Sequence, residues 1–195
     1  METVRYVFAY LTVGSVPFAV GYWYAIHPFV GFWRRRGPVL TYFAMTALLV
    51  LNLGLAWVYR APLFAVSYPT GPLHWGVAAA LYLTAMVIEL QCRRHLKFST
   101  LAGLPELSPP DDGPGELLQE GIYARVRHPR YISVGFGVLA AAVFCNYLSL
   151  WVIAILLFPA LFGIVLFEER ELVDRFGSAY IEYAQRVPRF IPRRG

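Results

Sequence analysis

Long apolar runs, separated by short polar segments, dominate the 195-residue chain. The apolar runs cover residues 4–25, 39–59, 73–92, 131–145 and 147–167. All except 131–145 have twenty residues or more, and an α-helix of about that length crosses a hydrocarbon core ~30 Å thick. Helices also satisfy their backbone hydrogen bonds internally, as lipid surroundings require. The pattern predicts an all-α integral membrane protein with about five transmembrane helices.

The basic residues are unevenly distributed over the polar segments. Segments 26–38, 93–130 and 168–195 hold 3, 6 and 6 of the 17 basic residues, and the other two are Arg5 and Arg60. Cytoplasmic segments of membrane proteins are enriched in lysine and arginine. Five helices would therefore place the N-terminus outside and the C-terminus in the cytoplasm.

The run at residues 131–145 is short for a membrane span. Its 15 residues make about 22 Å of helix, against a hydrocarbon core of ~30 Å. One end must lie below the membrane surface, so we expect a recessed, protein-lined cavity around Arg127, His128 and Tyr131. Asn146 is the expected turn of a helical hairpin formed with the following run.

The densest polar cluster is residues 121–131, which read Gly-Ile-Tyr-Ala-Arg-Val-Arg-His-Pro-Arg-Tyr. Pro129 suits the first turn of a helix, because it lacks an amide hydrogen and has a fixed φ, and it pushes His128 toward an extended conformation. A loop that ends at His128 and a helix that begins at Pro129 are predicted. The helix N-terminus and its neighbouring arginines would attract a carboxylate or a phosphate.

Two further polar segments accompany this cluster. Prolines and glycines exclude a continuous helix over 93–120, and a lid is one interpretation of this long loop, because it leads directly into the polar cluster. The last apolar run ends at an acidic stretch, 168–171. Beyond it, an amphipathic surface helix interrupted by Gly177 is predicted from apolar residues at spacings of four, four and three, namely Leu172, Phe176, Tyr180 and Tyr183.

We expect a single membrane domain over residues 1–195. Its predicted parts are three N-terminal spans (1–92), a cytosolic loop with the polar cluster (93–130), a helical hairpin (131–167), and a C-terminal helix with a basic tail (168–195).

Composition supports the membrane class and excludes several functions. Hydrophobic residues make up 58% of the chain and charged residues only 15%, whereas soluble domains carry about 25% charged residues. The net charge of +5 does not indicate nucleic-acid binding, because the basic residues flank the apolar runs. No zinc-type spacing, Ser-His-Asp arrangement or phosphate-binding glycine loop is present in the sequence. Cys92 and Cys145 are expected near opposite membrane faces, without a disulfide.

The predicted topology brings the polar cluster, the acidic stretch and the basic tail to the cytoplasmic side. Cations, carboxylates, phenols and a histidine would then meet at a lipid boundary. Such a site suits a reaction between a water-soluble cofactor and a lipophilic substrate that enters from the bilayer.

Four motifs in chain order carry a resemblance to a known family. They are Gly-Ile-Tyr-x-x-Val-Arg-His-Pro-x-Tyr, Glu-Glu-x-x-Leu, Phe-Gly-x-x-Tyr-x-x-Tyr and Val-Pro-Arg-Phe-x-Pro. In combination they resemble the isoprenylcysteine carboxyl methyltransferase family, which is related to integral-membrane phospholipid methyltransferases. The resemblance covers about residues 117–192, whereas the first ninety residues match only in being apolar spans.

The resemblance implies S-adenosyl-L-methionine as methyl donor, in a cytosolic cofactor pocket. The implied cofactor-binding residues are Tyr123, Arg127, His128, Pro129, Tyr131 and Glu169. The implied catalytic residues are Glu168, Glu169 and Arg127. A helix N-terminus and Arg127 suit the carboxylate of the cofactor, and acidic and aromatic groups favour its sulfonium.

One departure concerns the methyl acceptor. Carboxyl methyltransferases of this family usually carry an arginine about one turn before the acidic pair, but 162–167 holds no basic residue. The acceptor therefore stays open between a carboxylate, an amine, a thiol and another lipophilic group.

Bland alternatives exist for most of these residues. His128 would cap the helix, Glu168 and Glu169 would form a solvated helix start, and Tyr180 and Tyr183 would serve packing. Arg189 would bind a lipid headgroup or close the site.

Polar residues outside the cluster have simpler interpretations. Asn52 is expected to hydrogen-bond a neighbouring helix and Glu89 to pair with Arg93, while three histidines stay unassigned, His27, His74 and His95.

Two other functions compete with methyl transfer. Sterol and steroid reductases carry a similar Arg-His-Pro-x-Tyr segment, so an intramembrane NADPH-dependent reductase is one alternative. A non-enzymatic membrane protein whose basic tail binds anionic lipid is the other. Saturable binding of S-adenosylhomocysteine, of NADPH or of neither distinguishes the three.

Overall fold

The computed structural model describes residues 1–94 and 116–192. Every named element in these residues is a helix, which confirms the predicted all-α class. The elements are α1 (Glu2–Ile26), η1 (His27–Phe29), α2 (Val30–Arg36), α3 (Pro38–Val58), α4 (Arg60–Leu63), α5 (Pro72–Arg93), η3 (Gly121–Ala124), α8 (Pro129–Cys145), α9 (Leu148–Phe176) and α10 (Ser178–Arg186).

Four helical stretches in the described part of the chain are long and apolar enough to cross a membrane. They are Glu2–Trp33, α3, α5 and α9, while the apolar α8 is shorter at 17 residues. Large apolar side chains also cover the outer surface, with Phe43 72% exposed and Leu73 78% exposed, as lipid accommodates and water disfavours. The predicted integral membrane class is confirmed, whereas the number of five spans and their orientation stay predictions.

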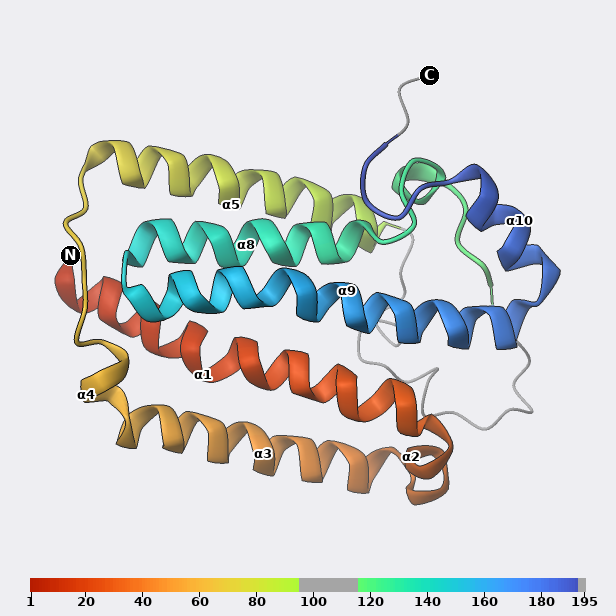
Figure 1. Ribbon diagram of the computed structural model, residues 1–195, viewed down its shortest axis with the longest axis horizontal. Helices are drawn as coiled ribbons and strands as arrows, with labels where there is room; N and C mark the ends of the chain where they lie inside the picture. Colours follow the sequence, from red (N-terminus) through yellow and green to blue (C-terminus); the bar gives the residue numbers. More distant parts are fainter. Residues whose placement is uncertain (95–115, 193–195) are drawn as a thin grey trace.

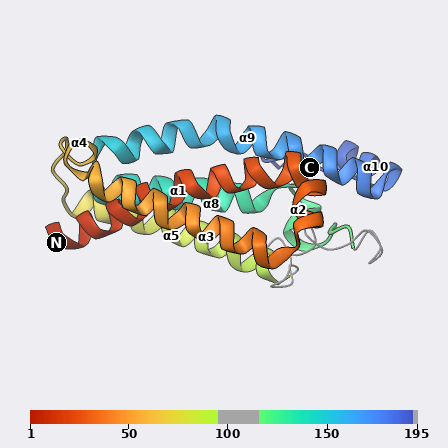
Figure 2. The same ribbon diagram turned by 90° about the horizontal axis from the view of Figure 1, so that it is seen from below.

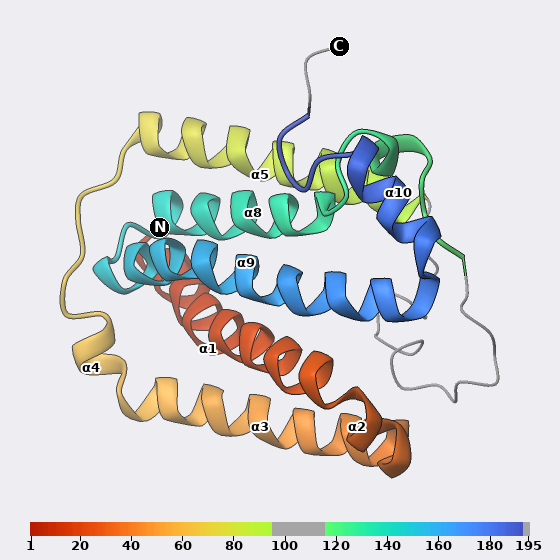
Figure 3. The same cartoon turned by 45° about the vertical axis from the view of Figure 1, so that its right-hand side comes forward.

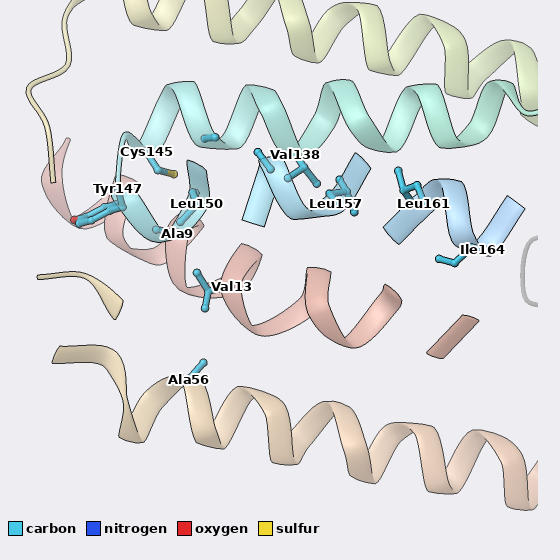
Figure 4. Close-up of a cluster of buried hydrophobic side chains, with 12 residues drawn as sticks. Ala9, Val13, Ala56, Val138, Cys145, Tyr147, Leu150, Leu157, Leu161 and Ile164 are labelled. Atoms are coloured by element: carbon cyan, nitrogen blue, oxygen red, sulfur yellow. The ribbon is translucent and has the colours of Figure 1, made fainter. Parts of the chain in front are cut away.

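The long helices lie side by side in the order α5, α8, α9, α1, α3 (Figure 1). The view from below shows a shallow bundle (Figure 2). The buried core lies where α1, α8 and α9 meet (Figure 4), and it includes Ala9, Val138, Leu150 and Leu157. Small residues such as Ala9 allow the close helix approach on which packing within lipid depends, since lipid removes most of the hydrophobic driving force between helices.

The helical hairpin turns at Asn146, as the sequence predicts. Asn146 adopts the left-handed conformation with φ 53°, and its amide donates to the carbonyl of Ala142. Its side-chain amide donates to the Pro69 carbonyl at 2.9 Å, and Trp151 donates to its Oδ1 at 3.0 Å. Both sides of the turn are thus held by specific hydrogen bonds, which stabilises a conformation that few residues other than glycine adopt.

The predicted end of the hairpin at residue 167 is wrong. Helix α9 continues through the acidic stretch to Phe176, so Glu168 and Glu169 lie inside a helix and are not a solvated helix start. Glutamate is a good helix former, and partners from other segments satisfy both carboxylates. Gly177, at φ 57°, ends α9 and so interrupts the helix where the sequence predicts, and the short α10 follows it.

Several local contacts agree with the sequence. Asn52 donates to the backbone carbonyl of Gly14 on α1, and Arg93 pairs with Glu89 at 3.0 Å. Cys92 and Cys145 are free and end different helices. The predicted lid falls largely on residues 95–115, outside the described residues, and so does His95.

The two ends of the bundle differ in polarity. The N-terminus and α4 lie at one end, while α2, the start of α8 and α10 lie at the other (Figures 1 and 3). The second end collects polar segments that are far apart in the sequence, as expected. It contains the candidate site.

Candidate functional site

The site is built around the start of α8. His128 is the N-cap residue with φ −122°, and Pro129 occupies the first turn of the helix. The loop therefore ends at His128 and the helix begins at Pro129, as predicted. Pro129 is fully buried, so its role is to set the helix start and the direction of the flanking side chains.

The C-terminal tail pairs with this loop through backbone hydrogen bonds. The Arg127 amide donates to the Pro188 carbonyl at 2.8 Å, and the His128 amide donates to the Arg189 carbonyl at 3.1 Å. This short pairing fixes the tail beside the loop, so the side chains of Arg127, His128 and Arg189 gather on α9. Nothing in the local sequence pattern signals it, because the paired segments are about sixty residues apart.

Glu169 is the centre of the resulting charge cluster. Arg127 Nη2 lies 2.6 Å from Oε1, Arg189 Nη2 lies 2.6 Å from Oε2, and His128 Nε2 lies 3.2 Å from Oε1. The Glu169 side chain is only 12% exposed. A buried carboxylate requires such partners, because an uncompensated charge in low dielectric is costly.

Arg127 is held almost entirely by the protein. Besides Glu169, its Nη1 donates to the backbone carbonyls of Ala184 and Val187, each at 2.6 Å. One guanidinium thus ties the start of α8 to α9, α10 and the tail. Both its predicted contact with a cofactor carboxylate and its predicted catalytic role stay predictions.

Glu168 is the more open member of the acidic pair. The Tyr131 hydroxyl donates to its Oε2 at 2.7 Å, and His128 Nδ1 lies 3.6 Å from the same oxygen. The Glu168 side chain is 29% exposed, against 12% for Glu169. Glu168 is therefore the carboxylate with room to meet a ligand.

The His128 ring lies between the two carboxylates. It is buried, and its two nitrogens face Glu168 and Glu169. It also packs near Tyr131 and Phe190, with ring centroids 5.9 and 6.1 Å apart. His128 holds the N-cap position, but its side chain makes no capping hydrogen bond and faces the two carboxylates instead.

Tyr123 lies at the edge of the cluster. Its side chain is buried and hydrogen-bonded to Cys92, and its backbone carbonyl accepts from the Tyr183 hydroxyl at 2.7 Å. Burial above all, with Cys92 and Glu168 adding to it, raises the pKa of Tyr123 far above its ordinary value. The phenol stays protonated and links η3 to α5, while the backbone carbonyl of Tyr123 links η3 to α10.

The structure therefore brings the predicted site residues to one place. Those connected by hydrogen bonds are Arg127, His128, Tyr131, Glu168 and Glu169, while Pro129 is buried in the first turn of α8 and Tyr123 precedes it in η3. Arg189 joins them, its guanidinium pairing with Glu169 and lying 5.9 Å from the Phe162 ring. The site-closing alternative for Arg189 fits this placement.

Sequence reasoning missed one ion pair beside the site. His27 Nδ1, at the end of α1, lies 2.9 Å from Glu171 Oε2 on α9. Its ring stacks on Trp23 with the centroids 5.2 Å apart. This pair ties the N-terminal helix to the segment of α9 that carries the acidic pair. Its only sequence signal is a histidine at one helix end and a glutamate at another.

A family model matches most of the helices that form this site. Residues 73–179 match the model described as phospholipid methyltransferase. This region runs from α5 through α8 and α9 into α10, and so begins earlier than the resemblance in the sequence motifs. It contains both the Arg-His-Pro segment and the acidic pair.

Curated relatives match over a shorter stretch. Protein-S-isoprenylcysteine O-methyltransferase B of Arabidopsis thaliana is 35% identical over 78 residues, 40% of this chain and 40% of the relative. Protein-S-isoprenylcysteine O-methyltransferase of Schizosaccharomyces pombe is 34% identical over 77 residues, 39% of this chain and 33% of the relative. The nickel-cobalt-cadmium resistance protein NccN of Alcaligenes xylosoxydans is 31% identical over 78 residues, 40% and 37% of the two chains.

The chain thus spans two fifths or less of the length of these relatives. No solved structure matches it. The family model, in contrast, covers more than half of the chain, and the contacts around Glu169 lie largely within the matched residues. The chain belongs to the phospholipid methyltransferase family.

Proposed function

We propose that this protein is an integral-membrane methyltransferase that transfers a methyl group from S-adenosyl-L-methionine to a lipophilic acceptor. The observation that carries the proposal is the cluster in which His128 and Tyr131 meet the acidic pair at the end of the bundle. Family membership supports the same reaction class.

The residues present fit such a cofactor. When bound, S-adenosyl-L-methionine supplies an electrophilic methyl group on a positively charged sulfur. Glu168 offers a partly exposed carboxylate that accepts from Tyr131, and the neighbouring His128 ring packs near the rings of Tyr131 and Phe190. Carboxylates and aromatic faces both favour a neighbouring cation.

The chain's own part in the reaction is mainly positioning. Glu169 and Arg127 fix the start of α8 against α9 and the tail, which holds His128 and Tyr131 in place. Methyl transfer needs the reacting groups aligned and water excluded, and preorganised surroundings supply a large part of the barrier reduction. In this assignment Glu168, His128 and Tyr131 face the cofactor, whereas Glu169 and Arg127 act through them.

The acceptor is proposed to enter from the bilayer, because the site lies at the end of helices whose outer faces are apolar. Two relatives are named isoprenylcysteine O-methyltransferases, which favours a carboxylate acceptor. The missing arginine in 162–167 argues less against a carboxylate here, because Arg189 from the tail lies beside Phe162. An amine or a thiol remains the alternative acceptor class.

Calorimetric titration of the detergent-purified protein with S-adenosylhomocysteine tests the proposal, with NADPH as the comparison ligand. Saturable binding of S-adenosylhomocysteine alone is expected. Binding of NADPH alone would reassign the same cluster to a reductase. Binding of neither by a folded sample would support a non-enzymatic protein that contacts anionic lipid.

A second test addresses topology, which we propose places the site in the cytoplasm. Cysteine introduced at Glu116 near the site and at Val66 near the opposite end can be labelled with a membrane-impermeant maleimide. The expected result is labelling of the Val66 variant in intact cells, with labelling of the Glu116 variant only after permeabilisation. The reverse pattern would invert the orientation.

A further inference from the structure

Helix α10 carries two buried tyrosines one turn apart, and their hydroxyls differ. Tyr180 is 2% exposed and Tyr183 is 3% exposed, with ring centroids 6.0 Å apart. Both pack in a cluster with Val187, as the packing interpretation of the sequence expects. The Tyr183 hydroxyl donates to the Tyr123 carbonyl at 2.7 Å. The Tyr180 hydroxyl is buried and has no hydrogen-bond partner among the described residues.

A buried hydroxyl without a partner is destabilising, because it has lost its hydrogen bonds to water and gained none. Such groups are rare in folded proteins, and each one needs an explanation. Packing alone does not provide one for Tyr180, because phenylalanine would fill the same space without the penalty. The hydroxyl is therefore expected to meet a group from outside the described chain.

The surroundings of Tyr180 are those of the candidate site. Arg127, which pairs with Glu169, donates to the carbonyl of Ala184 on the same helix, one turn from Tyr180. Burial above all, with Glu169 adding to it, raises the pKa of Tyr180 well above its ordinary value. The phenol therefore stays protonated and is available as a hydrogen-bond donor.

Glu169 is not a free acceptor for this donor. Its two oxygens already accept from Arg127, His128 and Arg189. The two guanidinium groups carry one positive charge more than Glu169, and the nearby Glu168 balances that charge. A donor hydroxyl beside two arginines is suited to a carboxylate oxygen.

We propose that the Tyr180 hydroxyl is a ligand-binding group of this site and donates a hydrogen bond to the amino-acid carboxylate of the methyl donor. The inference rests on the proposed function, since the hydrogen-bond acceptor that it assigns to Tyr180 is part of the proposed cofactor. It assigns to Tyr180 a role beyond the packing that it shares with Tyr183.

Tyr180→Phe and Tyr183→Phe form a matched pair of variants, because each removes one hydroxyl from the same buried helix. Two properties are measured for each, the unfolding temperature without ligand and the Kd for S-adenosylhomocysteine. A second titration uses the decarboxylated analogue of S-adenosylhomocysteine, which lacks the proposed hydrogen-bond acceptor.

Tyr180→Phe is expected to keep or raise the unfolding temperature and to raise the Kd for S-adenosylhomocysteine about tenfold, as for loss of a hydrogen bond to a charged group. Its Kd for the decarboxylated analogue should equal that of the unaltered protein. Tyr183→Phe should lower the unfolding temperature, because it leaves the Tyr123 carbonyl without its donor, and should change the Kd much less.

Three results would overturn the inference while leaving the proposed function intact. An unchanged Kd in Tyr180→Phe would mean that a buried water satisfies the hydroxyl. If Tyr180→Phe lowered the unfolding temperature as much as Tyr183→Phe does, the hydrogen-bond partner of the Tyr180 hydroxyl would lie within the chain. An equal rise in the Kd of Tyr180→Phe for both ligands would show that the carboxylate is not the hydrogen-bond acceptor. Failure of the unaltered, folded protein to bind S-adenosylhomocysteine would instead reject the proposed function, and the inference with it.

Discussion

Buried arginines hold both ends of α8, and the two differ in what surrounds them. At one end Arg5 donates from Nε and Nη2 to the Cys145 carbonyl at 3.1 and 2.7 Å. At the other end Arg127 pairs with Glu169 at 2.6 Å. The side chains of the two arginines are 5% and 8% exposed, so burial of an arginine does not by itself identify a site.

The carboxylate partners make the difference. Glu2, which pairs with Arg5, is 79% exposed and lies one turn away on the same helix. Glu169 is 12% exposed and also holds Arg189 and His128 from distant segments. A local pair with an exposed partner serves to tie a helix end. A site is indicated where several segments converge on one largely buried carboxylate, beside the partly exposed Glu168.

The largest effect is expected at the carboxylate where the segments converge. Glu169→Gln leaves Arg127 and Arg189 without their counter-ion in a largely buried place, which costs about 3–5 kcal/mol of unfolding free energy. Denaturant unfolding followed by tryptophan fluorescence in detergent measures it. Glu2→Gln is the matched control at the other end, and its effect should stay below about 1 kcal/mol because Glu2 is exposed. Equal effects of the two variants would remove the distinction between the two ends.

Arg5→Met should destabilise the fold without affecting ligand binding. It leaves the Cys145 carbonyl without a donor at the hairpin, and hydrogen bonds to charged groups contribute about 1.5–3 kcal/mol each. Unfolding free energy should fall by about that amount, while the Kd of the folded protein for S-adenosylhomocysteine stays within twofold. A large change in Kd would connect this end to the site and contradict the comparison.

His128 and His27 provide a second contrast, since the side chains of both are 3% exposed and lie against glutamates of α9. His128→Ala should leave the protein folded and raise the Kd for S-adenosylhomocysteine about tenfold, because the ring lies between the two carboxylates. His27→Ala should leave this Kd unchanged, since its partner is Glu171. An unaltered Kd in a folded His128→Ala sample would remove His128 from the site.

The smallest expected effect sharpens the role of Glu168. Glu168→Gln keeps an oxygen to accept from Tyr131 but removes the negative charge. Binding of S-adenosyl-L-methionine, which carries the sulfonium charge, should weaken about fivefold, whereas binding of neutral-sulfur S-adenosylhomocysteine should change less than twofold. Calorimetry with both ligands measures the ratio. An equal loss of affinity for the two ligands would show that Glu168 does not interact with the charge on the sulfur.

Sequence reasoning succeeded where structure follows from local rules. Pro129 begins α8 because its ring fixes φ, Asn146 turns the hairpin because its short polar side chain tolerates a positive φ, and Gly177 ends α9 for a similar steric reason. It failed at the acidic stretch 168–171, because a run of charges resembles the end of a membrane helix. The helix continues there, and its carboxylates are satisfied by side chains from other segments.

The sequence by itself determined the helical membrane class and the starts and ends of most of the long helices, because hydrophobic periodicity and backbone sterics act over a few residues. It also identified the polar residues that could bind a ligand or take part in catalysis. Only the tertiary structure decided that Arg127 is a clamp, that Arg189 reaches Glu169, and that the Tyr180 hydroxyl is buried beside the charge cluster. These features depend on pairings between α8, α9 and the tail. The partner of a buried charge is set by the packing that brings distant segments together, and no local pattern carries that information.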